Sequence, residues 1–240
     1  MSNADLLAKL AQFDTPTICN IIELFDVRPY TAGYMDGRIC AAFPEMGPIV
    51  GYAATATFRS AGPPPSGAGY GGMVEQVERF NELSGPAVVV FQDIDDPTVA
   101  ATFGEVMCTT YKAFGAVGLI TSGAGRDLDQ VRAIDFPVFT NGTICSHGYN
   151  HIPEVMVPVH VGGLFLYPDD MLHADVNGVS TIPKEIAADV ADVGAEFVAA
   201  EMVVIEAMRA PNPTIAQMKD ARAEMSARVA ELRKRVRKAQ

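Results

Sequence analysis

The chain has 240 residues, of which 49% are hydrophobic, and a formal net charge of −11 at pH 7. This length and composition suffice for one large domain with a full hydrophobic core, or for one domain with a helical appendage. The negative charge argues against nucleic-acid binding, because contacts to phosphates need clustered Lys and Arg.

The four cysteines are widely spaced and form no CxxC pair, so neither a zinc-binding cysteine cluster nor a disulfide framework is predicted. The first residues lack the basic-then-apolar pattern of a secretory signal. No apolar run approaches the roughly 20 residues of a membrane span. We therefore expect a cytoplasmic protein that does not enter a membrane.

Two short helices and one strand are predicted in the first quarter of the chain. Residues 3–12 have amphipathic spacing, and residues 14–17 resemble an N-cap followed by proline in the first turn, which predicts a second helix through Phe25. Ile49–Phe58 is rich in small and β-branched residues in partial alternation, which is typical of a strand.

A glycine-rich stretch follows this strand. Residues 67–72 match the pattern G-x-G-x-x-G and precede a predicted helix (73–83), an apolar strand (87–91) and Asp93, in the order of a dinucleotide-binding fingerprint. The fingerprint needs its first glycine directly after a strand, whereas three prolines (63–65) intervene here. A loop over a pocket is the preferred interpretation, and a dinucleotide site is the alternative.

The centre of the chain combines a helix, a strand and a charged turn. Residues 98–114 are predicted to form a helix with one buried face, and residues 117–121 a short buried strand. Residues 122–125 turn the chain at the carboxyl end of that strand, and Arg126 and Asp127 follow at once. Ligands in α/β proteins bind at such positions.

These charged residues suit a small anionic substrate. Arg126 can hold a carboxylate or an enolate through two parallel hydrogen bonds, and Asp127 offers a hard oxygen ligand to a divalent cation. The backbone N–H groups of residues 104–107, at a helix N-terminus, can bind a small anion. Together they describe a site for a small keto acid on a metal ion. The alternative is a solvated ion pair of little consequence.

Two other loops carry polar residues. Asp93, Asp95 and Asp96 follow an apolar strand, where they can attract a cation or only be solvated.

The second loop, residues 141–153, holds Cys145, His147 and His151. The two histidines have zinc-binding spacing if helical, but a glycine and a proline in the loop disfavour a helix. Cys145 and His147 can also be considered as a nucleophile pair. We favour a polar loop that rims the substrate pocket.

The last third of the chain changes from strands to helices. Two strands, a hairpin with its turn at Asn177-Gly178, and two helices are predicted, the second helix charged and basic at its C-terminal end. We divide the chain into an α/β domain, residues 1–208, and a C-terminal helical extension, residues 209–240. The predicted strands are 155–161, 164–167, 172–175 and 179–182, and the predicted helices are 184–208 and 214–238.

Three blocks, in this order, carry a resemblance to a known family. The chain resembles the 4-hydroxy-4-methyl-2-oxoglutarate aldolases and the regulator of ribonuclease activity A, many of which are labelled demethylmenaquinone methyltransferase-like. The similarity covers roughly residues 14–200. The blocks are Met46-Gly47-Pro48 with residues 51–58; Gly104-Glu105-Val106-Met107 with Gly115, Gly118 and Gly125-Arg126-Asp127; and residues 157–159, Gly162-Gly163, Pro168-Asp169-Asp170 and 175–183.

The resemblance implies an α/β fold, a layered β-sandwich flanked by helices of the swivelling αββα type, assembled as a homotrimer or hexamer with sites at subunit interfaces. It implies that Asp127 ligates Mg²⁺ or Mn²⁺ and that Glu105 holds a water on the metal. The amides of Gly104, Glu105, Val106 and Met107 would bind the pyruvate carboxylate, and Arg126 would stabilise the developing enolate.

The implied function is a metal-dependent carbon-carbon lyase that acts on a small 2-oxo acid and releases pyruvate, by retro-aldol cleavage or by β-decarboxylation of the oxaloacetate type. Both reactions share a stabilised pyruvate enolate. The alternative is a non-catalytic regulator that binds a partner protein such as a ribonuclease through an acidic surface. A dinucleotide-binding oxidoreductase is third.

Several positions depart from the family pattern. Residues 122–125 replace the usual aspartate-containing turn, Asn20 stands where a first-helix aspartate is usual, and residues 145–147 replace a loop that normally carries an arginine. We expect the metal and pyruvate end to be kept and the acyl partner to differ. Glu196 or Glu201 of a neighbouring subunit can supply a further acid.

Overall fold

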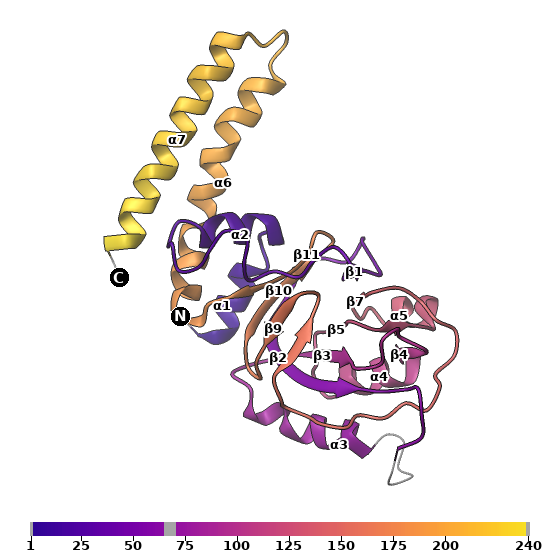
Figure 1. Cartoon of the computed structure of the whole chain (residues 1–240). Coiled ribbons are helices and arrows are strands. Elements are labelled where there is room, and N and C mark those ends of the chain that lie inside the picture. Colours follow the sequence, from indigo (N-terminus) through magenta and orange to yellow (C-terminus); the bar gives the residue numbers. More distant parts are fainter. Residues whose placement is uncertain (1, 65–70, 239–240) are drawn as a thin grey trace. The chain divides into compact units, whose positions relative to one another are not determined.

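The computed structural model describes residues 2–64 and 71–238, which form two compact units (Figure 1). The first unit comprises the chain up to Thr15 and Gly33–Pro183. The second comprises Pro16–Ala32 and the chain from Lys184 onward. Within the described part, no helix has both the length and the apolar composition needed to cross a membrane.

The first unit is built on a seven-stranded mixed sheet, and this confirms the predicted α/β class. Its four middle strands, β7, β5, β3 and β2, are mutually parallel, whereas the outer strands pair antiparallel. Carboxyl ends of parallel strands therefore meet at one edge. The strands in spatial order are β1 (Cys40–Ala41), β7 (Val138–Thr140), β5 (Gly118–Thr121), β3 (Ala87–Asp93), β2 (Ile49–Phe58), β10 (Met171–Asp175) and β11 (Gly178–Ile182).

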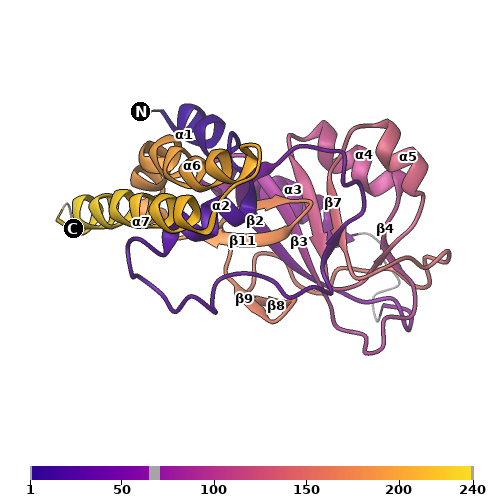
Figure 2. The same cartoon turned by 90° about the horizontal axis from the view of Figure 1, so that it is seen from above.

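Helices cover one face of this sheet and a β-hairpin covers the other, because alternate residues of each strand point to opposite faces. Val89 and Phe91 of β3 pack with the helices, and Val88 and Val90 pack with the hairpin. Figure 2 shows α4 and α5 on one side and the hairpin on the other. The layered arrangement is thus confirmed. The covering elements are α3 (Gly71–Glu78), η1 (Arg79–Glu82), α4 (Glu105–Ala113) and α5 (Leu128–Ala133), and β8 (Val159–Val161) with β9 (Leu164–Leu166).

A short parallel pair, β4 (Ala101–Phe103) and β6 (Ala124–Gly125), lies outside the main sheet. The prediction of a helix from residue 98 was therefore wrong at its start, since α4 begins only at Glu105. The side chains of β4 are all buried. The Phe103 ring lies so close to Gly125 that a side chain there would collide with it, and this explains the glycine before the Arg-Asp pair.

Other boundaries also differ from the sequence-based predictions. The strand expected over residues 155–161 is regular only from Val159, and the short elements β1 and α5 were not predicted. In contrast, β2, β5 and the β10–β11 hairpin lie where the pattern of apolar residues predicts them.

The N-terminal segment is tied to β10 through a buried histidine. Helix α1 (Asn3–Leu10) starts at Ser2, whose side chain forms a capping box with Asp5. The Leu10 carbonyl lies 3.2 Å from His173 Nε2, and Thr15 Oγ1 lies 2.9 Å from His173 Nδ1. Because a carbonyl can only accept, Nε2 carries the proton and Nδ1 accepts from the Thr15 hydroxyl. Both ring nitrogens are therefore paired.

The second unit is dominated by an antiparallel pair of long helices, α6 (Ala187–Arg209) and α7 (Ile215–Lys238), preceded by the short η2 (Lys184–Ile186). The two helices are joined by an ion pair between Glu196 and Arg235, at 2.6 Å. Helix α2 (Thr15–Ile22) lies mostly in this unit as well. The predicted domain boundary after residue 208 falls at the end of α6, between the two long helices.

Candidate active site

One cavity of the first unit, about 350 Å³ in volume, gathers most of the residues predicted to form a site. We call it the Arg-Asp pocket. The side chain of Glu105 is exposed and is not among the lining residues. Within the described part of the chain, the pocket is lined by Met73, Thr102, Phe103, Gly104, Val106, Met107, Arg126, Asp127, His147 and Asn150.

Asp127 is held in a left-handed backbone conformation, with φ 55°, which aspartate tolerates better than most residues. Although it precedes α5, its side chain does not cap that helix. Its Oδ2 instead accepts a hydrogen bond from the Glu105 amide at the start of α4, at 3.1 Å. The positive end of the α4 dipole favours a carboxylate at this place.

Gly104 is required by this contact. It precedes α4, and a β-carbon built on it would lie 2.6 Å from Asp127 Oδ2 and 3.2 Å from Arg126 Cγ. A side chain at residue 104 would therefore push Asp127 away from the helix. The Gly-Glu pair and the Arg-Asp pair, more than 20 residues apart in sequence, thus form one structure.

Arg126 is only loosely paired. Its Nε lies 3.7 Å from Asp127 Oδ2, and the two side chains are 33% and 36% exposed. Such a half-exposed pair adds little to stability. Since Asp127 is the only carboxylate among the described residues that pairs with Arg126, the guanidinium retains donors for a ligand.

Not all of the amides of residues 104–107, which were predicted to bind an anion, are available for a ligand. The Glu105 amide is already used by Asp127, and the first intrahelical bond runs from Cys108 to Gly104. The amides of Val106 and Met107, in the first turn, have no acceptor within the helix. These two residues line the pocket.

Two pocket residues come from the loop between β7 and β8. His147 lay in a loop predicted to rim the pocket, and its Nδ1 is 2.8 Å from the Gly148 carbonyl. Asn150 was not predicted, and it is only 7% exposed. Its Nδ2 donates to the Ala101 carbonyl at 3.0 Å, while its Oδ1 is buried and has no partner among the described residues. No local sequence signal distinguishes Asn150 from an ordinary loop residue.

The structure does not support the zinc site or the nucleophile pair that were considered for this loop. The loop contains no helix, so His147 and His151 lack the helical spacing that zinc binding would need, and His151 does not line the pocket. Across the described residues, no group of three His, Cys, Asp or Glu side chains could hold a metal ion. Cys145 is exposed and lies outside the pocket lining. Of the glycine-rich pattern, Gly67 and Gly69 lie outside the described residues.

The pocket wall is supported by a buried chain of hydrogen bonds. The Tyr111 hydroxyl of α4 donates to Gln76 Oε1 at 2.7 Å, and Gln76 Nε2 donates to the Ala54 carbonyl of β2 at 2.7 Å. Burial raises the pKa of Tyr111 and of Cys108, so both stay neutral. These hydrogen bonds fix α3, and with it Met73, against α4.

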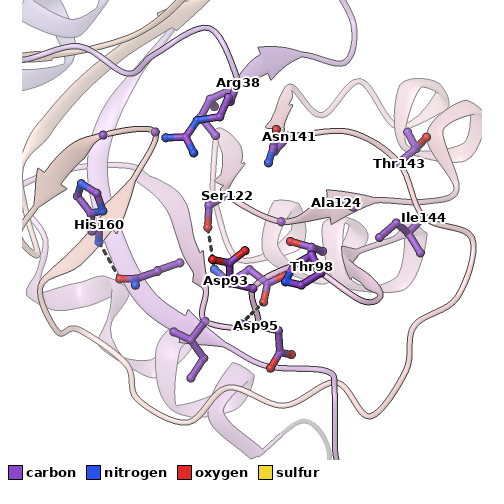
Figure 3. Close-up of a pocket in the computed structure, with 18 residues that line it drawn as sticks. Arg38, Asp93, Asp95, Thr98, Ser122, Ala124, Asn141, Thr143, Ile144 and His160 are labelled. Carbon is purple, nitrogen blue, oxygen red and sulfur yellow. Dashed lines mark hydrogen bonds between the residues drawn. The ribbon is translucent and has the colours of Figure 1, made fainter.

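A second and larger cavity, about 630 Å³, lies at the carboxyl ends of β3, β5 and β7 (Figure 3). Figure 3 shows Asp93 and Ser122 at its middle, with His160 on one side and Asn141 on the other. Burial raises the pKa of Asp93. Asp95, from the predicted acidic loop, accepts hydrogen bonds from Arg59 at 3.0 Å and from the amides of Ser60 and Ala61. We call this the Asp93 cavity, and it contains neither Arg126 nor Asp127.

Comparison with known proteins places the chain in a family. Residues 15–180, more than half of the chain, match the family described as RraA-like: Aldolase/RraA. The chain belongs to the RraA-like family. The match includes every residue of the Arg-Asp pocket.

Similar sequences among curated proteins carry an aldolase name. A Halalkalibacterium halodurans protein named "Putative 4-hydroxy-4-methyl-2-oxoglutarate aldolase" is 32% identical over 100 residues, which cover 41% of this chain and 48% of that protein. A Hahella chejuensis protein of the same name is 26% identical over 168 residues, which cover 64% of this chain and 96% of that protein. The chain thus spans about half of the length of the first relative.

Solved structures show the same fold. An uncharacterized protein from Pseudomonas syringae pv. tomato superposes with a TM-score of 0.71 at 20% identity, over 92% of this chain and 94% of the other. Streptomyces coelicolor RraAS2, described as an unusual member of the RNase ES inhibitor RraA protein family, has a TM-score of 0.67 at 21% identity, over 87% and 98%. The RraA-like fold is therefore common to all three chains.

Proposed function

We propose that this RraA-like protein is a divalent-metal-dependent lyase that cleaves a small 2-oxo acid and releases pyruvate, by retro-aldol cleavage or β-decarboxylation. The observation that carries the proposal is the convergence of Arg126 and Asp127 with the first turn of α4 in one pocket. The aldolase names of the relatives support the same reaction class.

The amides of Val106 and Met107 would bind the carboxylate of the 2-oxo acid, at the positive end of the helix dipole. Arg126 would stabilise the negative charge that develops on the keto oxygen as the bond next to C3 breaks. Its loose pairing with Asp127 supports this role, because a guanidinium already saturated by carboxylates would have fewer donors left for a substrate.

Asp127 is the proposed metal ligand. Oδ2 is held by the Glu105 amide, which leaves Oδ1 for a cation. A single protein carboxylate suits Mg²⁺ or Mn²⁺, since Mg²⁺ keeps several waters and is commonly bound through one or two carboxylates plus the substrate. The exposed Glu105 can supply the second carboxylate through a water. When bound, the ion would withdraw electrons from the keto acid.

We also propose a homotrimer or hexamer. Large apolar side chains are exposed beside the Arg-Asp pocket: Val74 is 60% exposed, Val106 79% and Phe114 63%. Val74 and Phe114 line one shallow groove, and Val106 lines the pocket itself. Contact with another copy would remove this surface from water. Light scattering after size-exclusion chromatography tests the assembly, and a monomer would contradict it.

The function is tested by measuring pyruvate release from oxaloacetate and from a 4-hydroxy-2-oxo diacid, with Mg²⁺ and with EDTA. We expect release that needs the metal and that disappears in Asp127→Ala. No release from any 2-oxo acid would contradict the lyase proposal. It would favour the alternative, a regulator that binds a partner protein, which the description of RraAS2 as a member of an RNase-inhibitor family makes the natural rival.

A further inference from the structure

We propose that the loop between β7 and β8 makes the Arg-Asp pocket selective for a 4-hydroxy-2-oxo acid with an uncharged, hydroxylated far end. Asn150 Oδ1 and His147 Nε2 would accept hydrogen bonds from that end, and His147 would take the proton of the C4 hydroxyl during cleavage. This inference rests on the proposed lyase function and names the substrate class of the same pocket.

Asn150 provides the first acceptor. The carbonyl of Ala101 can only accept, so the amide nitrogen of Asn150 must face it, and this fixes the orientation of the whole side-chain amide. Oδ1 is then a buried acceptor in a residue that lines the pocket, with no donor among the described residues. A buried acceptor without a donor is unfavourable, so a ligand with an O–H or N–H group would satisfy it.

His147 provides the second acceptor by the same logic. Its Nδ1 lies 2.8 Å from the Gly148 carbonyl, so Nδ1 carries the hydrogen. In the neutral ring the lone pair is then on Nε2. His147 lines the pocket together with Arg126 and Asp127. The loop thus presents two acceptors, which call for a ligand rich in donors.

The polar groups of the pocket disfavour a second carboxylate on the ligand. Among the described lining residues, Arg126 is the only Lys or Arg, and the proposed mechanism uses it at the keto acid end. Asn150 Oδ1 and His147 Nε2 accept but do not donate, so they would leave a second carboxylate without a hydrogen-bond partner. Met73 and Met107 offer apolar contact for a carbon chain. A neutral hydroxylated group suits these surroundings better than the second carboxylate of a diacid such as oxaloacetate does.

The proposed cleavage moves one proton to the protein and leaves one electron pair on the substrate. The C4 hydroxyl proton moves to His147 Nε2, and the O–H electron pair forms the C4 carbonyl as the C3–C4 bond breaks. The pair from that bond remains on C3 as pyruvate enolate, whose charge Arg126 stabilises. C3 then takes a proton from solvent, and the imidazolium returns its proton to solvent. Decarboxylation of oxaloacetate has no hydroxyl proton to remove, so it does not need His147.

The two reactions therefore separate the roles of the residues. We would measure kcat and KM for oxaloacetate, for 4,5-dihydroxy-2-oxopentanoate and for a 4-hydroxy-2-oxo diacid, in the full chain and in His147→Gln. We expect the hydroxy acid with the uncharged far end to be preferred over the diacid by at least tenfold in kcat/KM. His147→Gln should lower its kcat by about 10²–10⁴-fold, and oxaloacetate decarboxylation, which has no hydroxyl proton to remove, should lose at least tenfold less.

His151→Gln is the matched control, because it lies in the same loop outside the pocket lining, and it should leave all three substrates unchanged. Asn150→Ala should raise KM for the hydroxy acid by roughly tenfold, with a smaller effect on oxaloacetate. Thermal melting of each variant checks folding.

The outcomes are distinct. Equal losses on oxaloacetate and on the hydroxy acid, or a preference of the parent protein for the diacid, would overturn the selectivity proposal and leave the lyase standing. Absence of pyruvate release from every substrate by the unmodified protein would overturn the proposed function itself and, with it, this inference.

Discussion

The two cavities of the first unit differ in how their polar groups are paired, and this difference tells more than their size. In the larger Asp93 cavity, the Arg38 guanidinium binds both oxygens of Asp36, at 2.9 and 2.7 Å, and this pairing lowers the pKa of Asp36 to about 2. Asp95 is likewise bound by Arg59 and by backbone amides. Many charged groups of this cavity are therefore used within the protein, although Asp93 Oδ2 is buried and has no hydrogen-bond partner among the described residues.

In the Arg-Asp pocket, several groups keep unused capacity. Arg126 and Asp127 are 3.7 Å apart, and Asn150 Oδ1 has no donor among the described residues. A folded protein retains such groups at a cost in stability, which a binding site can justify. Among the described residues, each cavity thus has a buried oxygen without a donor, and the Arg-Asp pocket differs in placing a loosely paired guanidinium beside a carboxylate at the start of a helix.

The largest difference between the two cavities is expected when one carboxylate in each is neutralised. Asp127→Asn keeps an oxygen for the Glu105 amide and a residue that tolerates the left-handed backbone, yet removes the charge. We expect pyruvate release to fall by about 10³-fold, and Asp93→Asn to change it less than threefold. Steady-state kinetics of pyruvate release measure both effects. A larger loss from Asp93→Asn than from Asp127→Asn would place the reaction in the Asp93 cavity instead of the Arg-Asp pocket.

A second variant tests the position of the Asp127 carboxylate without altering the charge of the pocket. In Gly104→Ala the new methyl group would lie 2.6 Å from Asp127 Oδ2, so the carboxylate must move. Misplacement of this size should reduce kcat/KM by about 10²-fold. Gly47→Ala is the control, because the described residues place no atom within 4 Å of the point where its methyl group would stand. Similar activity of both variants would show that the Gly104 contact does not matter.

The support of the pocket offers a contrast in stability. Tyr111→Phe removes the donor to Gln76 Oε1 and leaves a buried acceptor, which should lower the free energy of unfolding by about 1–3 kcal/mol. Tyr149→Phe, at an exposed position, should cost less than about 0.5 kcal/mol. Urea unfolding measures both. Equal stabilities of the two variants would mean that the hydrogen bond between Tyr111 and Gln76 does not stabilise the fold.

The smallest expected effect concerns pH and the buried His173. Burial is the main cause that lowers the pKa of His173 below its ordinary 6.5, against the opposing carboxylates of Asp175 and Asp14. Below pH 6.5 the unfolded chain therefore binds a proton that the folded chain does not. The stability that His173 contributes above pH 6.5 is lost as pH falls toward the lowered value.

Melting temperature between pH 7.5 and 5.5 tests this expectation. The decline should be shallower in His173→Gln than in the parent protein, whatever the starting stability of the variant. An identical slope would show that His173 does not contribute, and that the fully paired ring is not a source of pH dependence.

The sequence predicted the central architecture because its signals are local. Short runs rich in apolar and β-branched residues, such as Ile49–Phe58 and 118–121, favour buried strands, and glycine before Arg126 indicates a tight turn. It also predicted that the Arg-Asp pair meets the start of a helix. The strand β4 was missed because three residues carry too little periodicity, and its placement depends on pairing with β6.

The rest of the pocket depends on long-range contacts that no local pattern records. Asn150 reaches the site because its side chain binds the Ala101 carbonyl, 49 residues away in sequence. Conversely, Glu105 was selected for its type and position, yet its backbone amide rather than its carboxylate faces Asp127. Residue types suggested the chemistry of the pocket, and tertiary contacts decided which atoms carry it.

The hydrogen bond between the Glu105 amide and Asp127 turns a single peptide group into a spectroscopic reporter. Any cation that binds the Asp127 carboxylate withdraws electron density from the oxygen that this amide contacts, so the amide proton resonance of Glu105 should move when Mg²⁺ is titrated. Its hydrogen exchange should report the same event. Occupancy of the proposed metal site could thus be followed at one backbone position, in the absence of substrate or turnover.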